Sequence, residues 1–273
     1  MNRLTKLSVI LLLLGSYGGQ LFCQDQVFPY RLHKYKEPLL LLSAATLDLS
    51  SYTIGKNISG LTNEEILALD RKDIHPFDRS ATYNWSIKSQ KNSNITKNSL
   101  KFLPGFLLLP EVKNKQWANC LTIGLMYFEA YYLNSNITNI TKVTVRRNRP
   151  YLYNTSFSED ERVTFRDHQN SYKSFFSGHT SAAFCSAAFL SKVYSDIYGR
   201  SKWSYLISGI SFSLAATTGY LRWKGGVHYP TDIIAGAIVG TSIGYLIPSM
   251  HKIRNKRFEA YILPNQFYIC YSL

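Results

Sequence analysis

Long apolar runs dominate the second half of the chain, and basic loops separate them. The runs occupy residues 102–110, 116–128, 174–191, 203–221 and 233–250. The last two hold 19 and 18 residues without a charge, which is the threshold length for a membrane-spanning helix. Buried helices of a soluble bundle show a similar pattern. The sequence therefore predicts an all-α protein and leaves open whether its helices lie in a membrane.

Small side chains recur at helical spacing in two of these runs. Pro230 is suited to a first helical turn, and glycine occupies every fourth position after Asp232 as far as Gly244. His179 heads a similar stripe of small residues that ends at Ser191. Such a stripe lets a helix approach its neighbour closely. We therefore expect the polar residue at the head of each stripe to be held rigidly.

The first residues have the order of a secretory signal peptide. Arg3 and Lys6 precede an apolar stretch at residues 7–14, and small and polar residues follow it. The apolar stretch is too short to span a bilayer. Residues 1–24 are therefore expected to be a signal peptide, and the protein is expected to be exported to the cell envelope.

Three regions are expected after the signal peptide. Residues 25–99 form a helical and loop region, with a helix start predicted where Thr62 precedes Glu65 as in a capping box. Residues 100–255 contain the apolar runs and form the expected helical core. Residues 256–273 form a C-terminal tail whose loose alternation around a Pro-Asn pair predicts a short hairpin.

The chain is strongly basic, with 31 Lys and Arg residues against 17 Asp and Glu residues and a net charge of +14. This charge suits an anionic partner, although a compositional bias towards lysine and asparagine would also produce it. No motif or aromatic platform for nucleic acid accompanies the charge, so nucleic-acid binding is not expected. The cysteines lack metal-type spacing, and no metal site or disulfide framework is expected.

The positions of the positive charges bear on topology. Lys142, Arg222 and Asp232 each stand near one end of an apolar run. Basic residues gather at the opposite ends of these runs. This distribution matches the positive-inside rule if those three residues face outward, towards the periplasm. The mean hydropathy of −0.13 and the short early runs argue in the other direction. Membrane association is the expectation, with a soluble bundle as its alternative.

Three polar clusters stand where apolar runs begin or end. They are KVTVRRNRP at 142–150, SGH at 177–179 and RWKGGVHYPTD at 222–232. Together they supply cations for phosphate oxygens, one histidine to attack phosphorus and a second to protonate the leaving group. Ser-Gly before a helix also suits an N-cap with free backbone N–H groups, which favours anion binding. This inventory suits phosphoryl transfer without a metal.

Simpler interpretations compete for some of these residues. For Arg146 and Arg147 in the first cluster, we prefer a solvated loop or an interfacial anchor. His179 taken singly fits a hydrogen-bonded core histidine equally well. Only the combination of the three clusters favours a catalytic site.

In their order and internal spacing, the clusters resemble the three signature motifs of the type 2 phosphatidic acid phosphatase (PAP2) superfamily. That superfamily also contains vanadium haloperoxidases and bacterial acid phosphatases. The resemblance lies in K-x6-RP at 142–150, SGH at 177–179 and R-x5-H-x3-D at 222–232, and it spans about 90 residues. It implies a PAP2-type helical bundle of about five to six core helices, with the site at the helix ends.

The resemblance also implies a role for each matched residue. His228 is the expected nucleophile, which forms a phosphohistidine, and Asp232 fixes its ring. His179 is the expected general acid for the leaving oxygen and later the base for water. No cofactor is implied. The expected phosphate-binding groups are Lys142, Arg149, Arg222, the Ser177 hydroxyl and the Gly178 backbone N–H.

Two positions depart from the family pattern. Phe176 stands where the second motif usually begins with proline, and Leu221 stands where the third motif usually has serine before its arginine. The first change removes a rigid turn residue but no phosphate contact, and the second removes a hydroxyl that would steady the site. Activity is expected to survive, with substrate preference as the property at risk.

The expected function is therefore a metal-independent phosphatase acting on a phosphate monoester or diphosphate. The membrane-like runs favour a lipid such as phosphatidic acid, phosphatidylglycerol phosphate or an isoprenoid diphosphate. The alternatives are a broad-specificity acid phosphatase for soluble esters, a vanadate-dependent haloperoxidase, for which the chain is short, and a non-enzymatic membrane protein that retains the motifs. The oligomeric state is not predicted.

Overall fold

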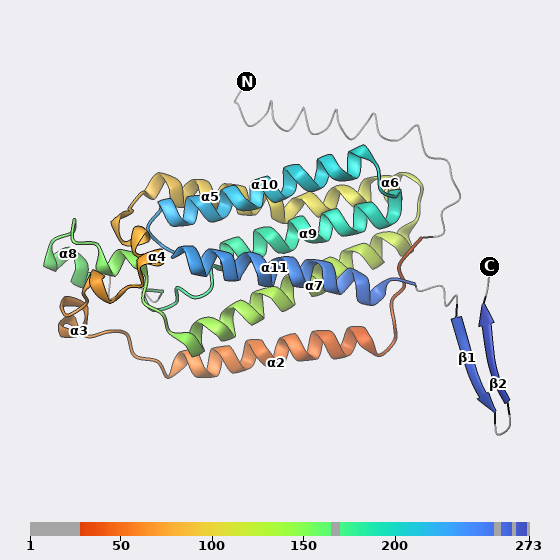
Figure 1. Cartoon of the computed structure of the whole chain (residues 1–273), viewed down its shortest axis with the longest axis horizontal. Coiled ribbons are helices and arrows are strands. Elements are labelled where there is room, and N and C mark those ends of the chain that lie inside the picture. The colour runs from red at the N-terminus through yellow and green to blue at the C-terminus, as the bar shows by residue number, and fades with distance from the viewer. Residues whose placement is uncertain (1–27, 165–169, 254–257, 264–265, 272–273) are drawn as a thin grey trace.

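Six long helices form the body of the protein, as expected for an all-α bundle (Figure 1). The computed structural model describes residues 28–164, 170–253, 258–263 and 266–271, so the expected signal peptide lies outside the described residues. The long helices are α2 (Lys36–Lys56), α5 (Ile87–Phe102), α7 (Trp117–Val145), α9 (Gly178–Tyr198), α10 (Lys202–Lys224) and α11 (Pro230–His251).

Short elements connect these helices and gather mostly at one end of the bundle (Figure 1). They are α3 (Asn63–Leu67), η2 (Arg71–Asp73), α4 (Pro76–Arg79), η3 (Ser80–Tyr83), η5 (Pro150–Tyr153) and α8 (Glu159–Thr164). At the other end, η4 (Leu103–Leu107) and α6 (Leu108–Lys113) join α5 to α7.

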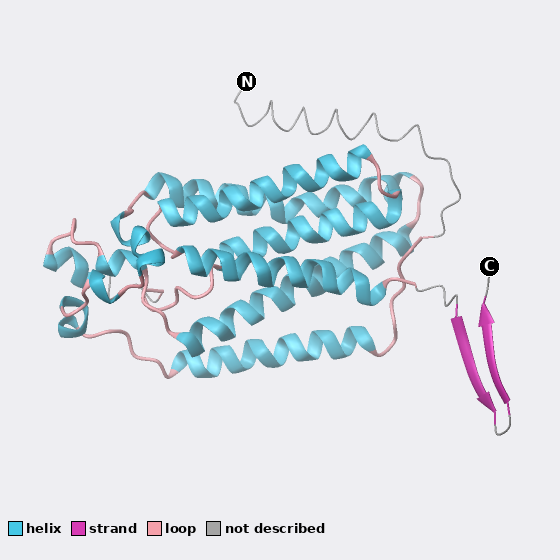
Figure 2. Cartoon of the chain, in the orientation of Figure 1, coloured by secondary structure: helices cyan, strands magenta, loops and turns pink. Residues whose placement is uncertain are grey.

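The C-terminal tail forms the predicted hairpin (Figure 2). Strands β1 (Phe258–Leu263) and β2 (Gln266–Tyr271) pair antiparallel, from Phe258 opposite Tyr271 to Leu263 opposite Gln266. The Pro-Asn pair proposed for the turn lies outside the described residues.

Helix α9 is the centre of the bundle. It packs against α5, α7, α10 and α11, and α2 covers α7 from outside. Its side chains are mostly buried, and Cys185, Phe189 and Val193 meet α7 and α11 residues such as Met126 and Ile247 in the largest apolar cluster. Because α9 begins at Gly178, this packing fixes the second polar cluster at the end of the central helix.

The glycine stripe of α11 lies directly against α9, as its spacing predicts. A Cβ atom on Gly236 would stand 2.7 Å from the Ser177 carbonyl oxygen, and Gly240 approaches the Ser181 carbonyl more closely still. No side chain fits in that space, so the two backbones touch. The stripe headed by His179 faces elsewhere, because Ala183 and its neighbours pack against α5 and α10.

The predicted helix starts are also present. Thr62 and Glu65 form the capping box that begins α3. The Ser177 hydroxyl accepts a hydrogen bond from the Thr180 N–H at the start of α9, and Pro230 is the first residue of α11. These local signals place the ends of α9 and α11, on which two of the three polar clusters depend.

Of the helices in the described ranges, only α11 is long and apolar enough to cross a membrane. The other uncharged run of similar length forms most of α10, which does not reach the same hydropathy. Only 33% of the apolar window of α11 is buried, so the protein's own core accounts for only part of its apolar character. Large apolar side chains are also exposed along other helices, including Leu39, Leu42, Leu49, Leu121, Phe128, Leu206, Ile210, Ile234, Ile238 and Leu246.

Candidate active site

His228 lies in the tight turn between α10 and α11, with 1% of its surface exposed. Gly226 adopts φ 72° there, and a Cβ atom on it would collide with the Asn84 carbonyl. The Asn84 side chain also donates a 3.1 Å hydrogen bond to the Trp223 carbonyl. Since only glycine fits this left-handed and crowded position, the turn is held against a segment that lies outside the three motifs.

Asp232 lies one helical turn after His228 and is fully buried. Its Oδ2 atom is 3.5 Å from His228 Nδ1 and accepts shorter hydrogen bonds from the Ser174 hydroxyl at 2.6 Å and the Tyr229 N–H at 3.0 Å. The carboxylate therefore faces Nδ1 at a distance longer than a hydrogen bond. This arrangement leaves Nε2 as the ring nitrogen available to phosphorus.

Arg147 joins this carboxylate, so the interpretation of Arg147 as a solvated or interfacial residue is wrong. Its guanidinium donates to Asp232 Oδ1 at 2.6 Å and to Asp78 Oδ2 at 2.7 Å, and it lies 4.0 Å from the centre of the Tyr229 ring. The arginine side chain is 26% exposed, against 0% for that of Asp232. A buried carboxylate needs a paired cation, which Arg147 provides.

Asp78, from α4, completes the network behind His228. It accepts the Thr231 backbone N–H at 3.0 Å and the Thr231 hydroxyl at 2.6 Å, in addition to the Arg147 guanidinium. The first turn of α11 is thereby fixed by a residue from the N-terminal region. The sequence offered no role for that region.

The second cluster lies beside the end of α7. A Cβ atom on Gly178 would stand 3.5 Å from Lys142 Nζ, so the ammonium lies next to the start of α9. The Ser177 hydroxyl is buried and accepts the Thr180 hydroxyl at 2.8 Å, which leaves the Ser177 hydrogen free to point at an anion. Cation, hydroxyl and helix N-terminus together suit a phosphate group.

The two remaining matched cations are buried close to His228. Arg149 donates its guanidinium hydrogen bonds to backbone carbonyls, among them that of Val227 at 3.1 Å, and so fixes the residue before His228. Arg222 donates to Ser93 Oγ at 3.4 Å, and its Nε has no partner among the described residues. Both side chains are less than one tenth exposed. All eight matched residues therefore meet at one end of the bundle.

The site holds both histidines in the neutral form. Burial lowers the pKa of His228 well below its usual value, and repulsion from Arg149, Arg222 and Lys142 adds to this effect. Burial likewise lowers the pKa of His179, with Arg222 as the strongest neighbouring charge. A neutral His228 keeps the lone pair that a nucleophile needs, and a bound phosphate would offset the cations that keep His179 unprotonated.

Lys142 titrates within the physiological range. Burial lowers the pKa of Lys142 to about 7, with further lowering by Arg149 and Arg222 and an opposite contribution from Asp232. The ammonium form is therefore present below pH 7 and is lost as the pH rises. The phosphate contact expected of Lys142 needs that charge, so affinity for phosphate should fall on the alkaline side.

We expect kcat/KM for a phosphate ester to decline above about pH 7, because kcat/KM reports the free enzyme. In Lys142→Arg the decline should move to higher pH, since a guanidinium keeps its proton. The measurement is the pH profile of kcat/KM for wild type, Lys142→Arg and Lys142→Ala. Superimposable wild-type and arginine profiles would show that another group titrates there.

Asn94 of α5 contacts the second histidine, a contact that no sequence motif indicated. His179 Nε2 lies 2.6 Å from Asn94 Oδ1. With the amide oxygen accepting, Nε2 carries the proton and Nδ1 remains for a substrate oxygen. Asn94 thus sets the tautomer of the expected general acid.

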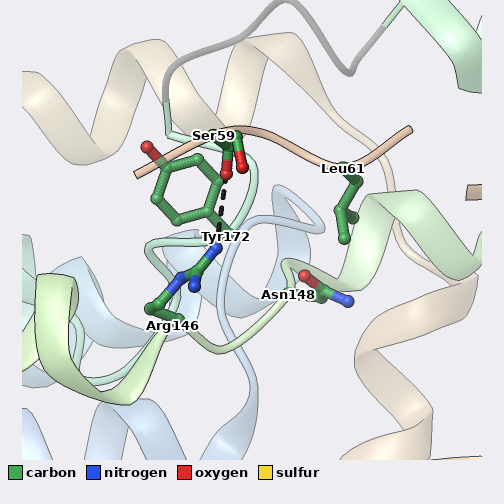
Figure 3. A pocket seen from close by; sticks show the side chains of 5 residues that line it. All are labelled: Ser59, Leu61, Arg146, Asn148 and Tyr172. Atoms are coloured by element: carbon green, nitrogen blue, oxygen red, sulfur yellow. Dashed lines mark hydrogen bonds between the residues drawn. The ribbon is translucent and has the colours of Figure 1, made fainter. Parts of the chain in front are cut away.

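A partly open cavity of about 310 Å³ adjoins the first motif on its outer side (Figure 3). Arg146 and Asn148 line it together with Ser59 and Tyr172, and Arg146 donates a 3.3 Å hydrogen bond to the Ser59 carbonyl. Arg146 is exposed, as the interpretation of a solvated loop residue requires. Neither His179 nor His228 lines this cavity, so it is separate from the candidate active site.

Comparisons with known proteins show the family to which the chain is similar. A family model described as the PAP2 superfamily matches residues 121–256. The chain is similar to a PA-phosphatase related-family protein of Dictyostelium discoideum, with 29% identity over 147 residues. That alignment covers 51% of this chain and 52% of the relative, so the chain spans about half the length of the curated relative that it matches.

Among solved structures, the chain is similar to a transmembrane PAP2 type phosphatidylglycerolphosphate phosphatase from Bacillus subtilis. The sequence identity is 19% and the TM-score is 0.39. The match covers 79% of this chain and 96% of the bacterial one.

Proposed function

The chain belongs to the PAP2 superfamily, and on that premise we propose that it is a metal-independent phosphatase working through a phosphohistidine. The observation that carries the proposal is the buried imidazole of His228, with a carboxylate on its Nδ1 side and three cations around it. Such a ring is neutral, oriented and surrounded by the charges that a transferring phosphoryl group requires.

In the first step, His228 Nε2 attacks phosphorus and the bond from phosphorus to the leaving oxygen breaks. The bound phosphate offsets the neighbouring cations, so the neutral His179 takes up a proton at Nδ1 when the substrate binds. His179 then gives this proton to the leaving oxygen, and the leaving group departs as an alcohol or as a phosphorylated product. Lys142, Arg222 and the N-terminus of α9 stabilise the charge on the equatorial oxygens. Asp232 stabilises the positive charge that the His228 ring acquires on forming the phosphorus–nitrogen bond.

In the second step, water attacks the phosphohistidine. His179, now without its proton, accepts one from the water, and the phosphorus–nitrogen bond breaks with its electron pair returning to His228. Inorganic phosphate leaves and both histidines regain their starting states. The proposed mechanism therefore requires His179 to act first as an acid and then as a base.

We place the protein at a membrane and favour a lipid phosphate as substrate. Helix α11 is apolar and only partly buried, and its first residues carry the site. The exposed apolar side chains on neighbouring helices would suit the same hydrocarbon environment. A lipid headgroup would then reach a site at the helix ends, which faces the periplasm in the proposed orientation.

Phosphate release from phosphatidic acid, a short isoprenyl diphosphate and p-nitrophenyl phosphate tests the proposal. Purified protein in detergent is assayed with and without EDTA. Release that EDTA does not diminish supports the metal-independent mechanism, and the rates rank lipid against soluble substrates. Absence of release from all three by folded protein would overturn the proposed activity and favour a non-catalytic role.

A further inference from the structure

We propose that Asn94 and Lys97 of α5 form a subsite for the leaving group, and that this subsite favours leaving groups that carry a phosphate, as organic diphosphates do. The inference rests on the proposed function and narrows its substrate class. Neither residue belongs to the three motifs.

Helix α5 lies antiparallel to the last turns of α10, with its register fixed by side-chain contacts. The contacts are Gln90 Nε2 to the Gly225 carbonyl at 2.9 Å, Arg222 Nη1 to Ser93 Oγ at 3.4 Å and Thr218 Oγ1 to Thr96 Oγ1 at 2.8 Å. Lys97 follows Ser93 by four positions and Asn94 by three. Helical spacing therefore places Lys97 on the face of α5 that meets the active site.

Asn94 marks the leaving-group side of the site. Its side-chain oxygen lies 2.6 Å from His179 Nε2, and His179 is the residue that protonates the leaving oxygen in the proposed mechanism. Whatever is bonded to that oxygen must therefore pass close to α5. Lys97, one turn further along the same face, lies near enough for its charge to act on His179.

Lys97 has no anion of its own in the described part of the chain. It is half-buried, and the charges that act on it are those of Lys101 and Arg222, both of which repel it. Holding a partly buried ammonium among other cations costs free energy unless an anion joins them. A bound ligand with negative charge near α5 would offset that cost.

The charge count separates two classes of substrate. The charges of Lys142, Arg149 and Arg222 already act on His228, where the transferred phosphoryl group would lie. An alcohol leaving group is neutral after protonation and gives Lys97 nothing to bind. In a diphosphate, His228 takes the terminal phosphoryl group, the bridging oxygen receives the His179 proton, and the departing monoester keeps its other charges beside Lys97.

The test compares farnesyl diphosphate with farnesyl phosphate, which share one hydrocarbon chain. In Lys97→Gln the ratio of kcat/KM for the diphosphate to that for the monophosphate should fall about 10- to 100-fold, as expected for losing one charge-assisted contact. Lys97→Arg should recover most of the ratio. Lys91→Gln, at an exposed lysine of the same helix, should leave it unchanged.

Equal losses on the two substrates, or an unchanged ratio, would overturn the subsite. If wild type hydrolyses neither compound, the proposed phosphatase function fails. The existence of the subsite is then tested separately, by ligand binding. Calorimetry with inorganic pyrophosphate and inorganic phosphate then replaces turnover. The subsite stands only if Lys97→Gln weakens pyrophosphate binding more than phosphate binding.

Discussion

His228→Ala should abolish phosphate release, with a loss of about 10⁴-fold or more in kcat, because the reaction loses its nucleophile. The imidazole is 1% exposed, and in the proposed mechanism it is the group that attacks phosphorus. Wild-type protein quenched during turnover should contain an acid-labile phosphohistidine, which the variant should lack. Steady-state assays and ³²P labelling of the quenched protein check the two expectations.

A matched control separates this effect from damage to the fold. His33→Ala removes an imidazole that precedes α2, where the nearby Arg31 N–H bonds the His251 carbonyl at the end of α11 far from the site, so its activity should equal that of wild type. His228→Asn keeps a polar side chain in the buried space and should fold while remaining inactive. Retained labelling in either His228 variant would assign the nucleophile to another residue.

Asp232→Asn should lower kcat by about 10³- to 10⁴-fold, since a neutral amide stabilises the developing imidazolium poorly and disturbs the ring's tautomer. The carboxylate accepts hydrogen bonds from Ser174, Tyr229 and Arg147, so the amide must also present an N–H to one of these donors. We expect a lower melting temperature together with a KM close to that of wild type. Kinetics and thermal unfolding in detergent measure both effects.

Asp78→Asn provides the comparison for this prediction. It weakens the support for Arg147 and Thr231 but leaves the Asp232 carboxylate in place, so the loss of kcat should be much smaller. Equal losses in the two variants would mean that the network acts mainly by holding the first turn of α11. Full activity of Asp232→Asn would contradict the charge-stabilising role.

Much of the fold was predictable because its signals are local. The glycine repeat after Asp232 predicted a close helix contact, and the structure places those glycines on the α9 backbone. The capping box at Thr62 and the start of α11 at Pro230 are also confirmed, since each depends on residues within one turn. The partner of the stripe headed by His179 was not predictable, because a stripe of small residues does not specify which helix it meets.

The charged groups around the site show where local pattern fails. Arg146 and Arg147 are neighbours with the same side chain, yet one is exposed and the other bridges Asp78 and Asp232. Their difference arises from the left-handed backbone at Arg146 (φ 52°), which ends α7 and turns the following residue inward. No composition or spacing argument contains that information.

The sequence by itself determined which residues were expected to carry the chemistry, because the three motifs lie at helix ends and their internal spacings are short. Only the tertiary structure decided what supports them. Asp78 lies behind His228, Asn94 contacts His179, and Lys97 lies among cations with no carboxylate beside it in the described residues. The contact of Asp78 with Arg147 joins positions 69 residues apart, and that of Asn94 with His179 joins positions 85 residues apart. Both depend on how α4 and α5 pack against the motifs. Periodicity reveals the face of a helix, whereas the neighbour that this face meets depends on how the whole core is filled.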